Sequence, residues 1–278
     1  MHGLEYGAPP KGVASESKIR LYGPQAFEGM RKAGQLAASA LDLLAEYIRP
    51  GITTESIDRL VFDFAMDHGA VPATLNYRGY PKSCCISLNH VVCHGIPGPR
   101  VLVEGDILNV DVTLILDGWH GDTSRMYTAG RVSRKAERLM DVTHEAMMRG
   151  IAAIKPGATV GDIGAAIQRY AEAERCSVVR DFCGHGVGLV FHDKPNILHY
   201  GTPGEGTVLE PGMIFTVEPM INLGKPYVKM LADGWTAVTR DRSLSAQFEH
   251  TVGVTAAGTE VFTFSPKGWH KPPYPAQV

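Results

Sequence analysis

YIRPGITTESIDRL (residues 47–60) and AIKPGATVGDIGAA (residues 153–166) align with each other at an offset of 106 residues. Each stretch places a Pro-Gly pair between two segments whose apolar residues recur every three or four positions. This recurrence predicts amphipathic helices, and a Pro-Gly pair ends one helix before the next begins. The sequence therefore predicts two similar helix–turn–helix units.

The helix boundaries have local chemical signals. In the first unit we expect a helix that begins at Pro24, a residue that suits a first helical turn, includes Ile48 and ends before Pro50-Gly51. A second helix follows over about residues 53–68. In the second unit Thr159 and Asp162 have the spacing of a capping box, which predicts a helix start at this point.

The similarity continues beyond the helices. It includes His-Gly-Ile (94–96) with His-Gly-Val (185–187), GDILNVD (105–111) with GMIFTVE (212–218), and Asp-Gly-Trp at 117–119 and 233–235. Several matches in the same order indicate an internal duplication. We therefore expect an α/β chain of two pseudo-symmetric halves, whose sheets meet at the centre.

Acidic residues interrupt the apolar strands of both halves. Asp111 and Glu218 lie at matching places, and each half adds a later acid, Asp122 or Glu249. A lone acid of this kind is most simply explained by a strand with one solvated face, but its recurrence weakens that explanation. Four carboxylates near one axis repel each other, and two divalent cations would balance them. Oxygen ligands with one imidazole suit first-row divalent metals, which makes His185 the natural fifth ligand.

The glycine-rich stretch around His185 has other interpretations. GHGVG resembles a phosphate-binding loop, but position 189 is Leu189 and Pro195 follows soon after, so the strand–loop–helix context is lacking. A structural zinc ion bound by Cys183 and His185 is a further alternative, weakened by the absence of a C-x-x-C pair. A buried core histidine without a ligand role is the simplest alternative.

Composition narrows the function classes. The chain has 278 residues and a formal net charge of -2, and its basic residues are scattered, which argues against nucleic-acid binding. No apolar segment is long enough for a membrane span, and the N-terminus has no signal-peptide pattern. The five cysteines are expected to be reduced thiols. We therefore expect a cytoplasmic monomer that binds neither nucleic acid nor membrane.

From about residue 20 to residue 263, including the acids and histidines named above, the sequence resembles type I methionine aminopeptidases. The matching motifs are CHGIP (93–97), NVDVT (109–113), DGWHGDTSRM (117–126), CGHGVG (183–188), FHDKP (191–195), FTVEPM (215–220) and SLSAQFEHT (243–251). The resemblance implies a pita-bread fold, in which a central antiparallel sheet is flanked by helices. A single catalytic domain (21–265) would follow a flexible extension (1–20) and precede a Pro- and Lys-rich tail (266–278).

The resemblance also implies roles for individual residues. The metal ligands would be Asp111, Asp122, His185, Glu218 and Glu249, with Asp122 and Glu249 bridging two ions. His94 and His192 would contact the scissile peptide and stabilise the intermediate, and Glu218 would shuttle a proton. The methionine pocket would be formed by Tyr77, Tyr80, Cys85, Phe191 and Trp235. A monovalent cation site would involve Asn89, Val91 and Ser245.

One residue departs from the family pattern, since Thr74 stands where other members have cysteine. From the aromatic residues alone, ordinary core packing would be the simpler explanation of the pocket. The departure affects the rim of the pocket and none of the expected metal ligands.

The implied activity is removal of the initiator methionine from nascent chains, in some contexts at the ribosome, with preference for a small second residue. A hydroxide bridging two divalent ions of iron, manganese, cobalt or zinc would attack the first peptide bond. An X-Pro dipeptidase or aminopeptidase P with the same fold is one alternative. A non-catalytic pita-bread binding protein is another, although such proteins typically lose metal ligands.

Overall fold

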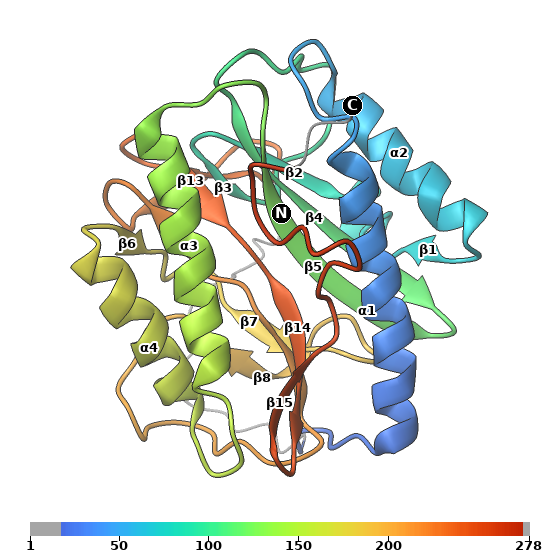
Figure 1. The fold of residues 1–278 in the computed structure, drawn as a ribbon, viewed down its shortest axis with the longest axis vertical. Helices are drawn as coiled ribbons and strands as arrows, with labels where there is room; N and C mark the ends of the chain where they lie inside the picture. The colour runs from blue at the N-terminus through green and yellow to red at the C-terminus, as the bar shows by residue number, and fades with distance from the viewer. Residues whose placement is uncertain (1–17, 275–278) are drawn as a thin grey trace.

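Two pairs of helices flank the strands in the computed structural model, which describes residues 18–274 (Figure 1). The first pair is α1 (Pro24–Leu44) and α2 (Thr54–Asp67), and the second is α3 (Arg134–Ala152) and α4 (Val160–Ala173). These pairs are the two helix–turn–helix units that the repeat predicts. Among the described residues, no helix is long and apolar enough to cross a membrane.

The helix ends follow the expected chemistry, with one difference. Thr159 and Asp162 form the capping box at the start of α4, as predicted. Helix α1 ends before Pro50-Gly51, as predicted, but its last residue is Leu44, so it does not include Ile48. Residues 45–47 form a turn, since the chain must leave the helical conformation before Pro50. Ile48 still donates its N–H to the Leu44 carbonyl and packs against the core, which explains its helical spacing.

The strands of the first half surround one long hairpin. They are β1 (Val71–Pro72), β2 (Cys85–Leu88), β3 (Val91–Cys93), β4 (Ile107–Leu116) and β5 (Trp119–Thr128). Asp117 and Gly118 join β4 to β5, and both have positive φ values (51° and 84°), as a type I′ hairpin turn requires. A short 3-10 helix, Tyr77–Gly79, lies between β1 and β2.

The strands of the second half are shorter. They are β6 (Ser177–Val178), β7 (Gly184–Gly186), β8 (Asp193–Ile197), β9 (Ile214–Val217), β10 (Met220–Asn222), β11 (Val228–Met230), β12 (Ala237–Thr239), β13 (Ser245–Gln247), β14 (His250–Thr255) and β15 (Gly258–Val261). The longest run of paired strands has the order β15-β14-β9-β7-β8, which places β8 at an edge. GHG is therefore a strand, which is incompatible with a phosphate loop that opens a helix.

The two halves meet between β5 and β14. An antiparallel bridge joins Ser124 to Glu249, so the hairpin β4–β5 lies beside the corresponding pair β9–β14. The expected central sheet is thus present, although it is divided into four antiparallel sheets among the described residues. Each half has its own apolar core.

One feature of the predicted repeat is wrong. Asp117–Trp119 joins the two acid-bearing strands of the first half, whereas Asp233–Trp235 lies between β11 and β12 in a separate sheet. A turn motif of this kind depends on local backbone geometry, so it recurs without marking equivalent positions.

Residues 265–274 cross the outer side of the first half. The Ser265 hydroxyl donates to Asp42 on α1, and the Tyr274 hydroxyl donates to the Met126 carbonyl at 2.7 Å. The carboxylate of Asp42 also accepts a hydrogen bond from Arg125 at 2.6 Å, and both side chains are buried. The predicted extension falls mostly in residues 1–17, which lie outside the described residues, as do residues 275–278 of the tail.

Candidate metal centre and catalytic cavity

The two acids of the first half lie on one face of the β4–β5 hairpin. Asp122 is the cross-strand partner of Thr113, and Asp111 is two residues from Thr113 on the same strand. The Thr113 hydroxyl donates to the Asp122 carboxylate at 2.6 Å. The alternation of side chains along the strands therefore directs both carboxylates into one cavity.

The two acids of the second half are brought to the same cavity by loops at strand ends. The sequence pattern predicts that Glu218 lies within a strand. In the structure it follows directly after β9. Pro219, which has no N–H to donate, follows it and separates β9 from β10. Glu249 lies between β13 and β14 and donates its backbone N–H to Ser124 of β5 at 3.1 Å.

Thr216 ties Glu218 to His185. Its hydroxyl donates to the Glu218 carboxylate at 2.7 Å and accepts the backbone N–H of His185 at 3.0 Å. The other carboxylate oxygen of Glu218 accepts a hydrogen bond from the Gln247 amide at 3.3 Å. These bonds fix the direction of the carboxylate.

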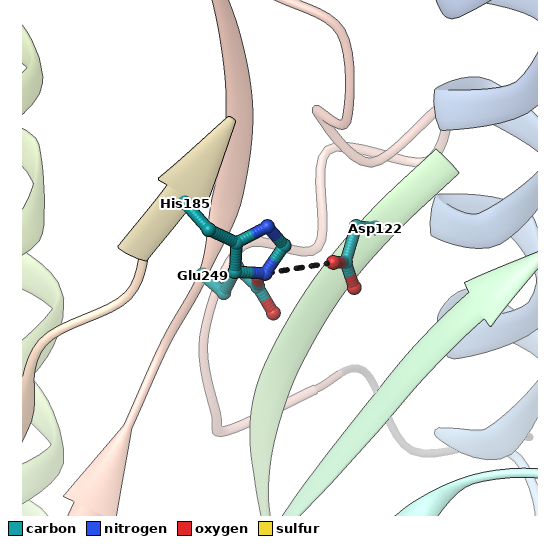
Figure 2. A group of neighbouring side chains, drawn as sticks. All are labelled: Asp122, His185 and Glu249. Carbon is teal, nitrogen blue, oxygen red and sulfur yellow. Dashed lines mark ion pairs between the residues drawn. The ribbon is translucent and has the colours of Figure 1, made fainter. Parts of the chain in front are cut away.

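The imidazole of His185 points at the carboxylates with an acceptor nitrogen. Its Nδ1 is 3.1 Å from the Gly186 carbonyl, which can only accept, so Nδ1 carries the proton. Nε2 then presents a lone pair to Asp122 at 3.5 Å and to Glu218 at 3.6 Å. Figure 2 shows this nitrogen directed toward Asp122, with Glu249 beside it. Acceptors facing acceptors at these distances are stable when a cation lies between them.

The electrostatics of the acids lead to the same conclusion. Burial and mutual repulsion raise the pKa values of Asp111 and Glu249 well above their usual range. Burial raises the pKa of Asp122 to about 7 and lowers that of His185 to about 4, so the imidazole is neutral and free to bind a metal. Ligand atoms of Asp122, His185 and Glu249 all lie within 4.8 Å of one another. Oxygen donors with one imidazole fit a first-row divalent cation, and Cys183 does not belong to this group.

The two further histidines line the same cavity. His192 makes a hydrogen bond of 3.0 Å from Nδ1 to the Tyr77 hydroxyl, and the centres of the His192 and His185 rings are 4.1 Å apart. The ring of His94 makes edge contacts with the rings of Trp235 and Phe182. Burial lowers the pKa of His94 to about 4 and also lowers that of His192, so both are neutral.

The predicted methionine pocket lies in the same cavity of about 500 Å³, which also contains the acids and both histidines. The cavity is lined by the expected Tyr77, Tyr80, Cys85, Phe191 and Trp235, together with Thr74. The hydroxyl of Tyr80 donates to the Gly95 carbonyl at 2.9 Å, so Tyr80 contributes the apolar face of its ring to the lining of the cavity. The Thr74 hydroxyl is buried with no hydrogen-bond partner among the described residues.

Several residues near the acids have no counterpart in the sequence predictions. Thr113 and Thr216 lie two positions from an acid, and a search for hydroxyl residues at that spacing would have found them. His199 is different, because no motif marks it. It is 0% exposed, its Nε2 accepts the backbone N–H of Glu218 at 3.1 Å, and its Nδ1 has no partner within the described part of the chain.

The predicted monovalent cation residues lie next to each other. Ser245 donates its N–H to the Asn89 carbonyl at 2.8 Å, and Val91 begins the neighbouring strand β3. The hydroxyl of Ser245 and the amide oxygen of its cross-strand partner Asn222 are buried without hydrogen-bond partners in residues 18–274.

Comparisons with known proteins identify the family. Residues 28–256 match the model of metallopeptidase family M24. The chain is 57% identical over 258 residues to the methionine aminopeptidase of Rickettsia prowazekii, covering 92% of this chain and 99% of that one. It is 49% identical to the methionine aminopeptidase of Escherichia coli K12, covering 88% and 94%. The crystal structure of the Rickettsia prowazekii enzyme superposes with a TM-score of 0.88, over 88% of this chain and 100% of that one.

The alternative functions fit less well. An Xaa-Pro dipeptidase from Bacillus anthracis shares the fold with a TM-score of 0.69 but is 25% identical, and the match covers 62% of its length. A non-catalytic binding protein is not supported, because all five expected ligand positions are filled by acids and histidine. The chain belongs to metallopeptidase family M24 and, within it, to the type I methionine aminopeptidases.

Proposed function

We propose that this chain removes the N-terminal methionine from newly made polypeptides whose second residue is small. The observation that carries the proposal is the unprotonated Nε2 of His185 facing two carboxylates in a cavity lined by aromatic rings and a thiol. Acceptors arranged in this way hold divalent cations, and an aromatic, sulfur-containing lining suits the flexible thioether of methionine. The cations would act on the first peptide bond, and the lining would hold the methionine side chain next to it.

Two divalent cations would be held by Asp111, Asp122, His185, Glu218 and Glu249. The donor set accepts iron, manganese, cobalt or zinc. When bound, the cations would lower the pKa of a water molecule and offset the charge that develops on the peptide carbonyl.

Glu218 would move the proton in this reaction. Its carboxylate is held by Thr216 and Gln247, and burial raises its pKa well above the usual range. A carboxylate with a raised pKa accepts a proton from the attacking water and returns it to the amine of the leaving peptide. The oxygen of the water forms a bond to the peptide carbonyl carbon, and the C–N bond breaks as the nitrogen becomes protonated.

His94 and His192 would orient the scissile peptide. Both are neutral, and a neutral imidazole offers one N–H donor and one acceptor. His192 is held by Tyr77, and the ring of His94 contacts those of Trp235 and Phe182. From these positions an imidazole N–H can donate to the peptide carbonyl oxygen, and the other ring nitrogen can accept from a peptide N–H.

Several further features belong to the same proposal. The polypeptide N-terminus would be presented in the cytoplasm, at the ribosome during synthesis. The five cysteines are free thiols in the structure, in keeping with a reducing compartment. The unpartnered oxygens of Ser245 and Asn222 support a monovalent cation near Asn89 and Val91. We expect the chain to act as a monomer.

A peptide panel with metal restored one ion at a time tests the proposal. Protein stripped with EDTA should be inactive, and Mn(II), Fe(II), Co(II) or Zn(II) should restore release of methionine from Met-Ala-Ser. Leu-Ala-Ser and Ala-Pro should be poor substrates, which separates this activity from that of an X-Pro peptidase. Intact Met-Ala-Ser under all metals would refute the proposal, and Glu218→Gln should bind peptide but turn it over far more slowly.

A further inference from the structure

The loop between β7 and β8, residues 187–192, carries two side chains that the proposed reaction needs. Phe191 lines the proposed methionine pocket, and the ring of His192 lies beside that of His185. Residues 188–192 form neither helix nor strand, so the hydrogen bonds of regular structure do not fix these two rings. Contacts with other segments must therefore determine where Phe191 and His192 lie.

His120 on β5 makes two hydrogen bonds to the start of this loop. Its backbone N–H donates to the Gly188 carbonyl at 2.9 Å, and its ring nitrogen Nδ1 lies 2.9 Å from the same oxygen. A carbonyl oxygen can only accept, so Nδ1 carries the proton and donates. The neighbouring Leu189 N–H reaches the Tyr22 hydroxyl at 3.4 Å, which is a longer and weaker bond. His120 therefore provides the stronger of these two anchors.

The ring of His120 also stacks on that of Phe191. The two rings are nearly parallel, with an angle of 18° between their planes and 5.7 Å between their centres. Phe191 in turn contacts the rings of Tyr77 and His192, with centres 4.8 Å and 4.1 Å away. His120 is not among the described residues that line the cavity. It therefore supports the pocket ring without forming part of the pocket lining.

The backbone beside His120 is packed directly against helix α1. A side chain on Gly121 would put its Cβ 2.1 Å from the Ala33 carbonyl, so only a glycine allows β5 to approach α1 this closely. His120 is also paired in register with Ile115 of β4. Because β5 belongs to the first half of the molecule and the loop to the second, His120 makes the position of the loop depend on that of the hairpin.

We propose that His120 is a positioning residue, which holds the loop so that Phe191 completes the methionine pocket and His192 reaches the scissile peptide. The inference rests on the proposed function, because it concerns the same pocket and the same reaction. The stacked ring acts on Phe191 and so on the discrimination between methionine and other apolar first residues. The hydrogen bond to Gly188 acts on the course of the loop and so on turnover through His192.

Three variants of His120 separate the two interactions in the Mn(II)-loaded enzyme. His120→Phe keeps an aromatic ring but loses the N–H donor, so kcat for Met-Ala-Ser should fall roughly 3–10-fold with little change in KM. His120→Asn keeps an N–H donor close to the position of Nδ1 but loses the ring. Its preference for Met-Ala-Ser over Leu-Ala-Ser, measured as the ratio of the kcat/KM values, should fall roughly 3–10-fold. His120→Ala should show both changes.

Two further measurements exclude a merely structural effect. A variant that only folds less well has fewer active molecules, but its kcat per folded molecule and its preference between the two peptides stay the same. The folded fraction of each variant is therefore measured. The Mn(II) content is measured as well, because His120 lies two residues from Asp122.

His68 provides the matched control. Its Nδ1 lies 2.8 Å from the Phe64 carbonyl and its ring stacks on that of Phe64, with centres 4.1 Å apart, but neither residue lines the cavity. His68→Asn and His68→Ala should therefore leave kcat and the preference for methionine unchanged. The positioning role is overturned if His120→Asn keeps that preference, if His120→Phe keeps kcat, or if activity falls only in proportion to Mn(II) content. Failure of the unmodified protein to cleave Met-Ala-Ser would instead refute the proposed function.

Discussion

The buried acid Asp42 and the four buried acids of the cavity have opposite environments. Asp42 on α1 is paired with Arg125 at 2.6 Å and receives further hydrogen bonds from Ser265 and the backbone of residue 267. The four acids of the cavity face each other and the lone pair of a histidine, and no lysine or arginine makes an ion pair with them among the described residues. The first group is complete within the chain, whereas the second needs cations from outside.

The effect of a buried acid on stability depends on whether it has a cationic partner. A buried acid that has its own partners contributes to structure, and removing one member leaves the other uncompensated. A buried acid cluster without cationic partners is strained in the metal-free protein, and removing one member relieves repulsion. Neutralising an acid of the cavity should therefore stabilise the metal-free protein and lower activity, whereas neutralising Asp42 should destabilise the protein and leave activity nearly unchanged.

The largest expected effect is on activity at the cavity. Asp122→Asn should lower kcat/KM for Met-Ala-Ser by roughly 10³-fold or more, because a ligand charge at the metal centre is lost. The same change should raise the free energy of unfolding of the metal-free protein, since one of the mutually repelling carboxylates becomes neutral. Activity assays and urea unfolding after EDTA treatment measure both quantities. A destabilised metal-free variant would contradict the interpretation of the cluster as strained.

The reverse outcome is expected at the paired site. Asp42→Asn should lower the free energy of unfolding by about 3–5 kcal/mol, since the buried guanidinium of Arg125 loses its charged partner. The activity of the folded fraction should stay within about twofold of that of the unmodified protein, because Asp42 does not line the cavity. Asp63→Asn is a suitable control, as that acid makes an exposed pair with Arg59, and pairs of this kind contribute about 0–1 kcal/mol.

A third expectation concerns pH and only the metal-free protein. The pKa of Asp122 is raised to about 7 by burial, whereas in the unfolded chain it lies near 4. Between these values Asp122 is protonated in the folded protein and ionised in the unfolded chain, so its contribution to stability is highest at low pH and falls as pH rises toward 7. The buried histidines act in the opposite direction, so this contribution is measured as the difference between the protein and Asp122→Asn in urea unfolding at pH 5 and pH 8, and it should amount to roughly 1–4 kcal/mol. Mn(II) should restore more stability at pH 8 than at pH 5 in the unmodified protein.

Sequence reasoning reached the parts of this molecule that local pattern determines. The helix pairs follow from apolar periodicity and from Thr159 with Asp162, and the direction of Asp111 follows from strand alternation. It was wrong where the position of a residue depends on contacts between distant segments. Glu218 lies past its strand because the chain changes sheets at Pro219. The Asp233–Trp235 turn lies in a different sheet from the strands that carry the acids. The burial alternation of residues 194–200 could not be predicted, because this segment includes Pro195 and its apolar and polar residues do not alternate in the sequence.

His199 provides the smallest and most selective test. Its Nε2 accepts the backbone N–H of Glu218, so it positions the proton-carrying carboxylate without facing substrate. His199→Leu removes the acceptor at similar size and should lower kcat by roughly 10–100-fold with little change in KM, the usual effect of losing a group that orients a metal ligand. His199→Gln places an amide oxygen near the same position and should recover much of kcat. If both variants lost stability alike and neither changed kcat per folded molecule, His199 would serve only packing, and the position of Glu218 would depend on Thr216 and Gln247 alone.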